Sequence, residues 1–283
     1  MKCIDLHTHT IHSDGTLSPV KLVEQAHANR LCAISITDHD TIDALAQGQA
    51  AAERLGIEFV PGCELSVYEG DIQIHILGYY IDATNQALIT QLENLRALRD
   101  QRNDSMLKAL ERLGMPIPRD VLRDMASSRL ITRMHVAKAM KHLGYCRTYD
   151  EAFEKYISYG RPAFVPHESM SVSACIDVLR GAGGVPVLAH PYSYELNTEE
   201  IEPLIAKLAS YGLEGLECFY HNHTKMQTKR ALSWASKHRL LSTGGSDFHG
   251  ANRPGVELGR GSGGLCVPYS VWENLANHVN KIR

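Results

Sequence analysis

The first residues of the chain alternate between apolar and polar side chains, and this period of two predicts a β-strand over 2–9. Ile4 and Leu6 would face one side of this strand, whereas His7 and His9 would face the other. The two histidines would therefore lie side by side, as two ligands of a single metal ion must.

Beyond this strand, most of the chain alternates between strand-like and helix-like segments. Short apolar runs predict strands over 32–37, 57–61, 72–79, 185–189, 213–219 and 239–243. Apolar residues spaced for one helix face predict a helix capped by Ser18 and further helices over 41–55, 172–181, 198–210 and 224–237. Such alternation predicts βαβ units around a mostly parallel sheet or barrel.

A segment in the middle of the chain differs, because it lacks strand-like sequence. Leucines at helical spacing predict a long helix over 86–113, which Gly114 and Pro116 would end. Shorter helices are expected over 119–126, 133–143 and 149–156. A helical block between barrel strands is typical of a lid over the strand ends.

The length of 283 residues suits one α/β barrel with a full hydrophobic core. We expect a barrel domain made of 1–82 and 160–283, with 83–159 inserted as a helical cap domain. The hydrophobic content of 44% and charged content of 22% are ordinary for a globular protein. The sequence shows no leader and no apolar run of membrane-spanning length, so we expect a cytoplasmic protein that does not bind membranes.

Charge and cysteine content narrow the picture further. A net charge of −3 gives no general attraction to polyanions, so a nucleotide or RNA would have to be held by local cations. The cysteines are odd in number, show no CxxC spacing and stand at positions 3, 32, 63, 146, 175, 218 and 266. We therefore expect reduced thiols and no disulfide framework.

Histidines and carboxylates recur near the expected strands from one end of the chain to the other. The candidates are His7, His9, Asp14, His39, Glu64, His75, His190, Asp247 and His249. The carboxyl ends of barrel strands converge on one face, so these side chains would form one site. Nitrogen and oxygen ligands without cysteine suit a hydrolytic centre of two or three divalent metals, with manganese foremost and iron or zinc as alternatives.

Some of these residues also have an ordinary interpretation. Glu64 alone would be a surface carboxylate, yet at a strand end its two oxygens could bridge two metals. His75 alone would be a buried core histidine. Residues near expected strands with a weaker claim to the site are Glu217, His221 and His223.

The expected cap contributes a row of cations. Arg96, Arg99 and Arg102 recur every three residues on the long helix and would share one face, for which a solvated surface is the ordinary interpretation. Further cations near the site's expected entrance are Arg133, His135, Arg161 and His167. Arginines above a metal cluster favour a phosphate ester over an uncharged amide, because both neutralise phosphoryl oxygens.

The segments DLHTHTIHSDG, ITDHDT, PGCELS, IHILG, AHP and GSDFH stand in the order of a known set of signature blocks. In these segments the chain resembles the PHP (polymerase and histidinol phosphatase) family of metal-dependent phosphoesterases. ITRMH and GRPAFVPH are similar to the subgroup that dephosphorylates nucleoside 3′,5′-bisphosphates, whose close bacterial members also trim RNA from its 5′ end (ribonuclease AM). One departure is Tyr192-Ser193-Tyr194, where relatives often have Gly-Arg-Tyr, so one arginine that could bind phosphate is missing.

The resemblance implies a distorted (β/α)7-type barrel with an inserted helical cap, and hydrolysis of nucleotides or short RNA without an obligate protein partner. It implies one metal on His7, His9, Glu64 and Asp247, and a second on Glu64, His75 and His190. Asp14, His39 and His249 would hold a third metal or contact phosphate. It also places near the substrate Arg99, Arg102, Arg133 and His135. We expect the leaving hydroxyl to take its proton from a metal-bound water or from the catalytic candidates His190 or His249.

Alternative functions remain open at this point. A histidinol- or sugar-phosphate phosphatase would use the same barrel, but it would not need several cap arginines for a second phosphate. An amidohydrolase also begins with HxH on a strand, yet it usually has a lysine ligand at a strand end, and none of these strand ends has one. A non-catalytic metal-stabilised module would be expected to have lost ligands, whereas every candidate is present.

Overall fold

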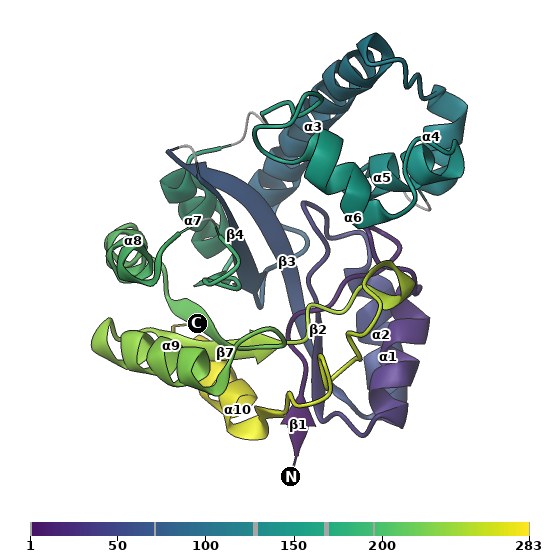
Figure 1. Ribbon diagram of the computed structural model, residues 1–283. Helices are drawn as coiled ribbons and strands as arrows, with labels where there is room; N and C mark the ends of the chain where they lie inside the picture. Colours follow the sequence, from purple (N-terminus) through teal and green to yellow (C-terminus); the bar gives the residue numbers. More distant parts are fainter. Residues whose placement is uncertain (1, 71, 127–129, 167–169, 195, 283) are drawn as a thin grey trace.

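The computed structural model describes residues 2–70, 72–126, 130–166, 170–194 and 196–282 (Figure 1). Its strands are β1 (Cys3–Ile4), β2 (Ala33–Ile36), β3 (Glu58–Glu69), β4 (Ile72–Tyr79), β5 (Val185–Leu188), β6 (Gly215–Tyr220), β7 (Leu241–Gly245) and β8 (Val267–Pro268). Its helices are α1 (Pro19–Ala28), α2 (Leu45–Leu55), α3 (Gln86–Arg112), α4 (Arg119–Met125), α5 (Arg133–His142), α6 (Tyr149–Ala152), the π-helix η1 (Phe153–Ile157), α7 (Val172–Gly181), α8 (Thr198–Ser210), α9 (Lys225–Lys237), the 3-10 helix η2 (Gly250–Asn252) and α10 (Tyr269–Ile282).

The sheet closes into a barrel through the first residues of the chain. The main sheet has the order β2-β3-β4-β5-β6-β7. Toward β2, the amide of Asp5 donates to the carbonyl of Ala33 at 3.1 Å, and toward β7 the amide of Leu6 donates to the carbonyl of Gly244 at 3.2 Å. Residues 3–9 therefore lie between the two edge strands, and the expected distorted barrel is confirmed.

One strand departs from the expected parallel arrangement. β4 is antiparallel to both of its neighbours, β3 and β5, whereas β2/β3, β5/β6 and β6/β7 are parallel pairs. The cause is the short connection between β3 and β4, which comprises only residues 70 and 71. A parallel crossover needs a dozen or more residues, so this connection can form only a hairpin.

The expected strand over 57–61 is too short, because β3 continues to Glu69. Its second half pairs with β4 along the full length of the hairpin, with Ser66 opposite His75. Glu64 and His75 consequently lie inside strands. The sequence pattern had placed Glu64 at a strand end, and this expectation was wrong. The hairpin extends past the last residue of β2 and thereby reaches the face where the other candidate ligands gather.

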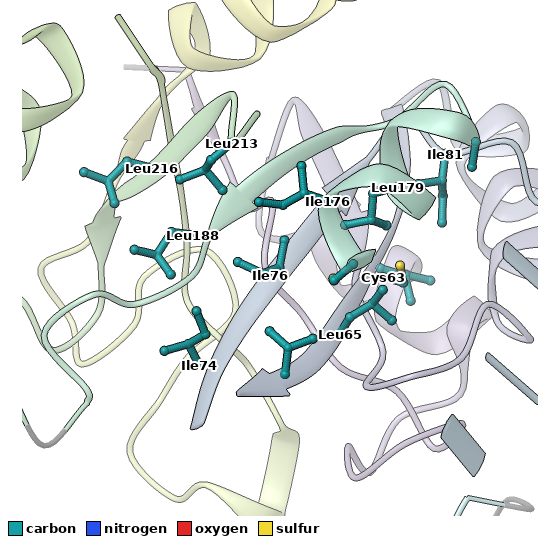
Figure 2. Packing of buried hydrophobic residues seen from close by; sticks show 14 of the residues in the cluster. Cys63, Leu65, Ile74, Ile76, Ile81, Ile176, Leu179, Leu188, Leu213 and Leu216 are labelled. Carbon is teal, nitrogen blue, oxygen red and sulfur yellow. The ribbon is translucent and has the colours of Figure 1, made fainter. Parts of the chain in front are cut away.

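The barrel is packed on its outer side by helices. Figure 2 shows Cys63, Leu65, Ile74 and Ile76 of the β3–β4 hairpin in one buried cluster with Ile176 and other residues of α7. Removal of this much apolar surface from water is the main source of fold stability. The helices that cover the sheet therefore fix the positions of the strands that display the candidate ligands.

The helices between β4 and β5 contain a hydrophobic cluster of their own, which includes Met106, Leu110, Val136, Met140 and Ile157. The long helix α3 belongs to both parts, since its first turns, with Leu88, Leu92 and Leu95, pack in the barrel cluster. Figure 1 shows α3 to α6 at the end of the molecule opposite α10 and the amino terminus. Within the described ranges no helix, α3 included, is apolar enough over a sufficient length to cross a bilayer.

The carboxy-terminal helix α10 is not among the helices expected from the sequence. Val271, Leu275 and Val279 recur at helical spacing, and they pack with Val185 and Val187 of β5. This face was readable as an amphipathic helix. α10 seals the barrel on the side of the amino-terminal strand ends.

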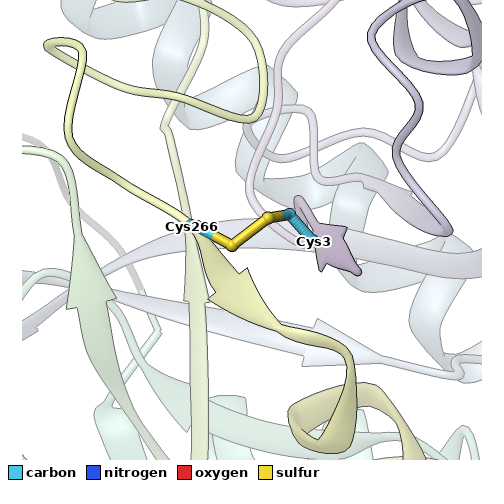
Figure 3. The surroundings of a disulfide bond; sticks show 2 residues. All are labelled: Cys3 and Cys266. Carbon is cyan, nitrogen blue, oxygen red and sulfur yellow. A yellow bond between two sulfur atoms is a disulfide. The ribbon is translucent and has the colours of Figure 1, made fainter. Parts of the chain in front are cut away.

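A disulfide joins Cys3 of β1 to Cys266, directly before β8 (Figure 3). The expectation of reduced thiols throughout was therefore wrong for this pair, although the other cysteines are free thiols. Sequence could not reveal the pairing, because the partners are separated by 263 positions and come together only when β1 pairs with β8. Their Cα atoms lie 5.3 Å apart, within the usual range for a disulfide.

Replacing both cysteines by serine, Cys3→Ser with Cys266→Ser, should lower the free energy of unfolding by about 2–4 kcal/mol. The cross-link lowers the conformational entropy of the unfolded chain, and its loss raises that entropy and so favours unfolding. Urea unfolding of the double variant and of the wild type, each with and without dithiothreitol, measures the effect. Cys32→Ser, which removes a free thiol beside β1, is the control. A wild-type midpoint that does not respond to dithiothreitol would contradict the cross-link.

Candidate metal centre

The structure brings all of the expected metal ligands together at one face of the barrel. Their nitrogen and oxygen atoms form overlapping groups in which every ligand atom lies within 4.8 Å of the others. These groups are His9, Asp14, His39 and His249; His7, Glu64 and His190; His7, His9 and Asp247; and His39, Glu64 and His75. The overlaps show a single cluster with several positions for cations.

Glu64 lies at the centre of the cluster and is completely buried. Its Oε2 atom is 3.4 Å from Nε2 of His7 and 3.3 Å from Nε2 of His9. Its Oε1 atom is 2.9 Å from Nδ1 of His75 and 3.0 Å from Nε2 of His190. Oε2 also lies 3.0 Å from Nδ1 of His39, so the two oxygens of one carboxylate face different imidazoles, which is the geometry a bridging ligand needs.

Asp247 completes the group around His7 and His9. Its Oδ1 atom is 3.4 Å from Nε2 of His7 and 3.1 Å from Nε2 of His9. Its Oδ2 atom accepts a hydrogen bond of 2.9 Å from the hydroxyl of Tyr220 and pairs with the guanidinium of Arg253. The carboxylate is therefore oriented from one side and leaves its other oxygen for the histidine pair.

Asp14 gathers the remaining ligands on the side of the helical segment. Its Oδ1 atom is 3.2 Å from Nε2 of His249 and 3.9 Å from Nε2 of His39. Nδ1 of His249 lies 2.8 Å from the carbonyl oxygen of Asp247. A proton on Nδ1 would be donated to that carbonyl, which leaves the lone pair of Nε2 facing Asp14.

A second layer of carboxylates orients the ligands. Glu217, a weaker sequence candidate, lies 3.0 Å from Nδ1 of His7 through one oxygen and accepts the amide of His190 at 2.7 Å through the other. It is buried and belongs to none of the groups of possible ligands, so we assign it the role of orienting His7 and His190 and not that of a ligand. Asp38, which the sequence reasoning missed, accepts hydrogen bonds from the amide of Thr10 at 2.7 Å and the hydroxyl of Ser13 at 2.5 Å.

Unpartnered buried atoms in the cluster indicate that it fits cations. Several of its buried atoms have no hydrogen-bond partner among the described residues: Nε2 of His7, Nε2 of His9, Oδ1 of Asp14, Nδ1 of His39, Oε2 of Glu64 and Oδ1 of Asp247. Unsatisfied buried polar atoms are costly and rare, and here they converge on shared positions. Imidazole and carboxylate atoms arranged in this way fit Mn, Fe or Zn.

The electrostatics of the carboxylates agree with this result. Burial by itself would raise the pKa of Glu64, but the neighbouring His39, His75 and His7 hold that pKa well below its usual value. Burial likewise opposes ionisation of Asp247, whose pKa is held low by Arg253 and the surrounding histidines. The carboxylates are therefore anionic at neutral pH, the state in which they bind cations.

The backbone is strained at three points around the cluster. Asp40, His190 and Asp247 have positive φ angles of 47°, 23° and 54°, which side chains other than glycine rarely adopt. Such conformations persist at functional sites where the surrounding structure enforces them. Gly245 is required for a different reason, because a Cβ atom there would lie 2.3 Å from the backbone nitrogen of His7.

The arginines of the helical segment share a cavity with the cluster. A cavity of about 170 Å³ is lined by Asp14, His39, His75 and His249 from the barrel and by Arg99, Arg102 and Arg133 from the helices. Arg102 is nearly buried and donates to Asn103 at 2.7 Å, whereas Arg133 donates to Gln73 of β4 at 3.1 Å. Burial and the neighbouring Arg133 lower the pKa of Arg99 to about 10, so it remains charged.

Several of the cations expected near the substrate have other partners or lie outside the cavity. Arg99 lines the cavity, but its guanidinium pairs with the buried carboxylate of Asp40. His135 is buried at the start of α5, where its Nδ1 accepts the amide of Thr132 at 3.0 Å, and it is not among the residues lining the cavity. Burial lowers its pKa to about 4, so it is neutral at pH 7. Arg96 faces Asp43, and His167 lies outside the described residues.

Arg253 is a cavity residue that the sequence reasoning missed. It lines the two cavities that meet at the cluster, and it contacts both the carboxylate and the carbonyl oxygen of Asp247. Its position four residues after His249 was a usable signal, because it shares a loop with two ligands. His221 and His223, in contrast, belong to none of the groups of possible ligands.

Comparison with known protein families assigns the chain to a family. The family model described as PHP domain matches residues 5–160. The chain belongs to the PHP family. The resemblance to this family that the signature segments of the sequence indicate is confirmed.

Individual PHP relatives match this chain over nearly its whole length. A 3′,5′-nucleoside bisphosphate phosphatase from Chromobacterium violaceum is 33% identical over 99% of this chain and 98% of its own. A 5′-3′ exoribonuclease from Haemophilus influenzae is 32% identical over 97% of this chain and 99% of its own.

Solved structures give the same result. An amidohydrolase from Chromobacterium violaceum, determined with bound sulfate and no metal, has a TM-score of 0.87 at 32% identity and covers 97% of this PHP protein and 96% of its own chain. A Bifidobacterium adolescentis protein described as a metal-dependent phosphoesterase has a TM-score of 0.85 at 33% identity, with 97% and 96% covered. The likeness therefore includes the helical segment as well as the barrel.

Proposed function

We propose that this PHP protein is a metal-dependent phosphoesterase of the cytoplasm that removes the 3′-phosphate from nucleoside 3′,5′-bisphosphates. By the same reaction it would hydrolyse the first linkage of short 5′-phosphorylated RNA. The names of the Chromobacterium and Haemophilus relatives support these two substrates. A histidinol- or sugar-phosphate phosphatase is the alternative within the same fold.

One observation favours a substrate with two phosphates. The cavity beside the cation-binding cluster is walled on its other side by Arg102 and Arg133. One phosphate over the cluster and a second on the arginines would fill both ends of this cavity. A monophosphate would leave the buried guanidinium of Arg102 and the half-buried one of Arg133 without a counter-ion, which is unfavourable.

The residues present fit two or three divalent metals, for which we propose manganese, with iron or zinc as alternatives. His7, His9, Glu64 and Asp247 would hold one ion, and Glu64, His75 and His190 a second. Asp14, His39 and His249 would hold a third ion or contact phosphate. Bound in this way, the metals supply Lewis acidity and a lowered pKa of water near the phosphorus.

The chain's own residues bind and orient the substrate. Arg102 and Arg133 would take the phosphate that does not react, in hydrogen bonds strengthened by charge. Arg99 would act mainly through Asp40, because its guanidinium is already paired there. His190 and His249 flank the reacting phosphate in this arrangement, and one of them would pass a proton to the departing 3′-hydroxyl.

We further propose that residues 83–159 work as a cap over the metal centre. Their separate hydrophobic cluster supports a unit that packs independently beyond the first turns of α3. The barrel has a complete set of candidate ligands, and the cap would add the cations that bind substrate phosphate. These are Arg99, Arg102 and Arg133. With the cap in place, bulk water would be excluded from the site, and only the water that reacts would remain beside the phosphate.

A substrate panel tests the proposal. Protein reconstituted with Mn²⁺ is assayed for phosphate release from a nucleoside 3′,5′-bisphosphate, a nucleoside 3′-monophosphate, histidinol phosphate and a sugar phosphate. The bisphosphate should give the highest kcat/KM, and chelation by EDTA should abolish it. A preference for histidinol phosphate or the sugar phosphate would favour the alternative. Elemental analysis with less than one equivalent of metal after reconstitution would contradict the metal centre.

A further inference from the structure

A second groove leads away from the metal centre. It has a volume of about 380 Å³ and is lined by Tyr68, Ile72, Gln73, Arg133, Ser158, Tyr159, Phe164, Ser193 and Tyr194. Four of these residues are aromatic, an unusual share for the surroundings of a phosphate site. None of them is among the candidate metal ligands, and the proposed function leaves Tyr68, Tyr159 and Phe164 without a task.

The groove is continuous with the reaction site. Gln73, Arg133, Ser193 and Tyr194 also line the cavity of about 300 Å³ that contains Glu64, His75, His190 and Asp247. A molecule whose phosphate lies on the metal ligands could therefore extend past Arg133 into the groove. Arg133 lines the groove but Arg99 and Arg102 do not, so the groove leaves the reaction site past Arg133 and not along the other two arginines.

Tyr159 is placed to receive a flat ligand. Its side chain is 62% exposed, which is exceptional for a large apolar group among the described residues. Its ring lies 5.5 Å from the ring of Phe164 in an edge-to-face arrangement. An exposed aromatic face costs free energy in water unless a partner covers it.

The turn that presents these rings is built by the backbone. The amide of Arg161 donates to the carbonyl of Ser158 at 3.0 Å, and the amide of Phe164 donates to the carbonyl of Arg161 at 3.0 Å. Gly160 has a φ of +70°, which a larger residue would adopt only with strain. Tyr159 and Phe164 are thus fixed relative to each other before any ligand binds.

We propose that this groove binds the second nucleoside of a short RNA, the one attached to the reacting phosphate through its 5′ oxygen, by stacking its base against the aromatic pair Tyr159 and Phe164, whose rings stand edge to face. Aromatic platforms beside a phosphate site are the usual means of binding single-stranded nucleic acid without strong sequence preference. A nucleoside 3′,5′-bisphosphate has no such nucleoside and would leave the groove empty. The groove would therefore favour RNA over the bisphosphate. This inference rests on the proposed function.

The reaction with RNA balances without any additional reactant. Water adds to the phosphorus, and the bond between phosphorus and the 3′ oxygen of the first nucleotide breaks. That nucleotide leaves with a 3′-hydroxyl, which takes one proton of the water. The shortened RNA keeps the phosphate on its new 5′ end and remains stacked in the groove until it is released.

Matched substrates test the groove. The Mn²⁺-loaded wild type, Tyr159→Ala, Tyr159→Phe and Phe164→Ala are compared on a 5′-phosphorylated dinucleotide and on the bisphosphate of its first nucleoside. Tyr159→Ala and Phe164→Ala should each lose about 5- to 150-fold in kcat/KM on the dinucleotide. Activity on the bisphosphate should stay within about twofold, and Tyr159→Phe should behave as wild type because stacking needs the ring and not the hydroxyl.

A spectroscopic measurement complements the kinetics. A non-hydrolysable dinucleotide analogue with 2-aminopurine as its second base should lose fluorescence on binding to the wild type, and the loss should be absent with Tyr159→Ala. Met226→Ala removes another exposed apolar side chain, 72% exposed on α9, and should change nothing. Equal losses on both substrates, or no loss on either, would overturn the inference. A wild type that fails on the bisphosphate would instead refute the proposed function.

Discussion

Replacing Glu64 by alanine should reduce kcat more than any other single substitution among the ligands. Its two oxygens face different sets of imidazoles, so its removal would take a ligand from two proposed cation positions at once. Loss of a residue that only orients ligands typically costs about 10- to 100-fold, which is the effect expected of Glu217→Gln. Glu64→Ala should exceed that range and should also exceed His249→Ala.

The measurement pairs turnover with metal content. Each variant is reconstituted with Mn²⁺, assayed at saturating Mn²⁺ and analysed for bound metal, with thermal unfolding as a check on the fold. Glu64→Ala should retain its fold but lose more than one equivalent of metal relative to wild type. Turnover close to wild type at saturating Mn²⁺ would contradict the bridging position.

Replacing Arg133 by alanine should weaken activity on a substrate with two phosphates but not on a substrate with one. Arg133→Ala deletes a cation at the arginine end of the cavity without leaving a buried carboxylate unpaired, which Arg99→Ala would do to Asp40. A lost hydrogen bond to a charged group costs about 1.5–3 kcal/mol, equivalent to about a 10- to 150-fold loss in kcat/KM on a 3′,5′-bisphosphate. A small chromogenic phosphate ester, which has no second phosphate, should be hydrolysed as before.

The control for this experiment is Arg112→Ala, an exposed arginine at the end of α3 that is far from the cavity lining. It should leave both activities unchanged. Equal losses on the two substrates with Arg133→Ala would mean that Arg133 supports the fold or contacts the reacting phosphate. No loss on either substrate would show that it does not bind a phosphate.

The ligand cluster was predictable because its pattern is local. His7 and His9 alternate on one strand, and Asp247 and His249 share one loop, so a few neighbouring letters define each fragment. Convergence of the fragments follows from barrel topology. Glu217 and Asp38 were harder to identify, because their importance comes from partners such as His7 and Thr10, which are distant or unmarked in the sequence. Arg253, six residues after its partner Asp247, could have been identified from the sequence.

The fold shows the same division between local and distant information. The helices and most strands followed from periodicity, whereas the antiparallel direction of β4 depended on the length of one connection. The Cys3–Cys266 bond depended on the pairing of β1 with β8 at opposite ends of the chain. Arg99 illustrates a further limit: helical spacing placed it on the correct face, but only the tertiary structure shows that it pairs with Asp40.

The position of residues 3–9 between β2 and β7 has a consequence for synthesis on the ribosome. The strand with His7 and His9 is translated long before its neighbour on one side, which includes Gly244. Contacts over such a separation form late, since the entropy of a long loop must be overcome before they stabilise anything. A nascent chain that stops before β7 would have most of the candidate ligands but an open barrel, so we expect cation binding to begin only after β7 and Asp247 have been translated.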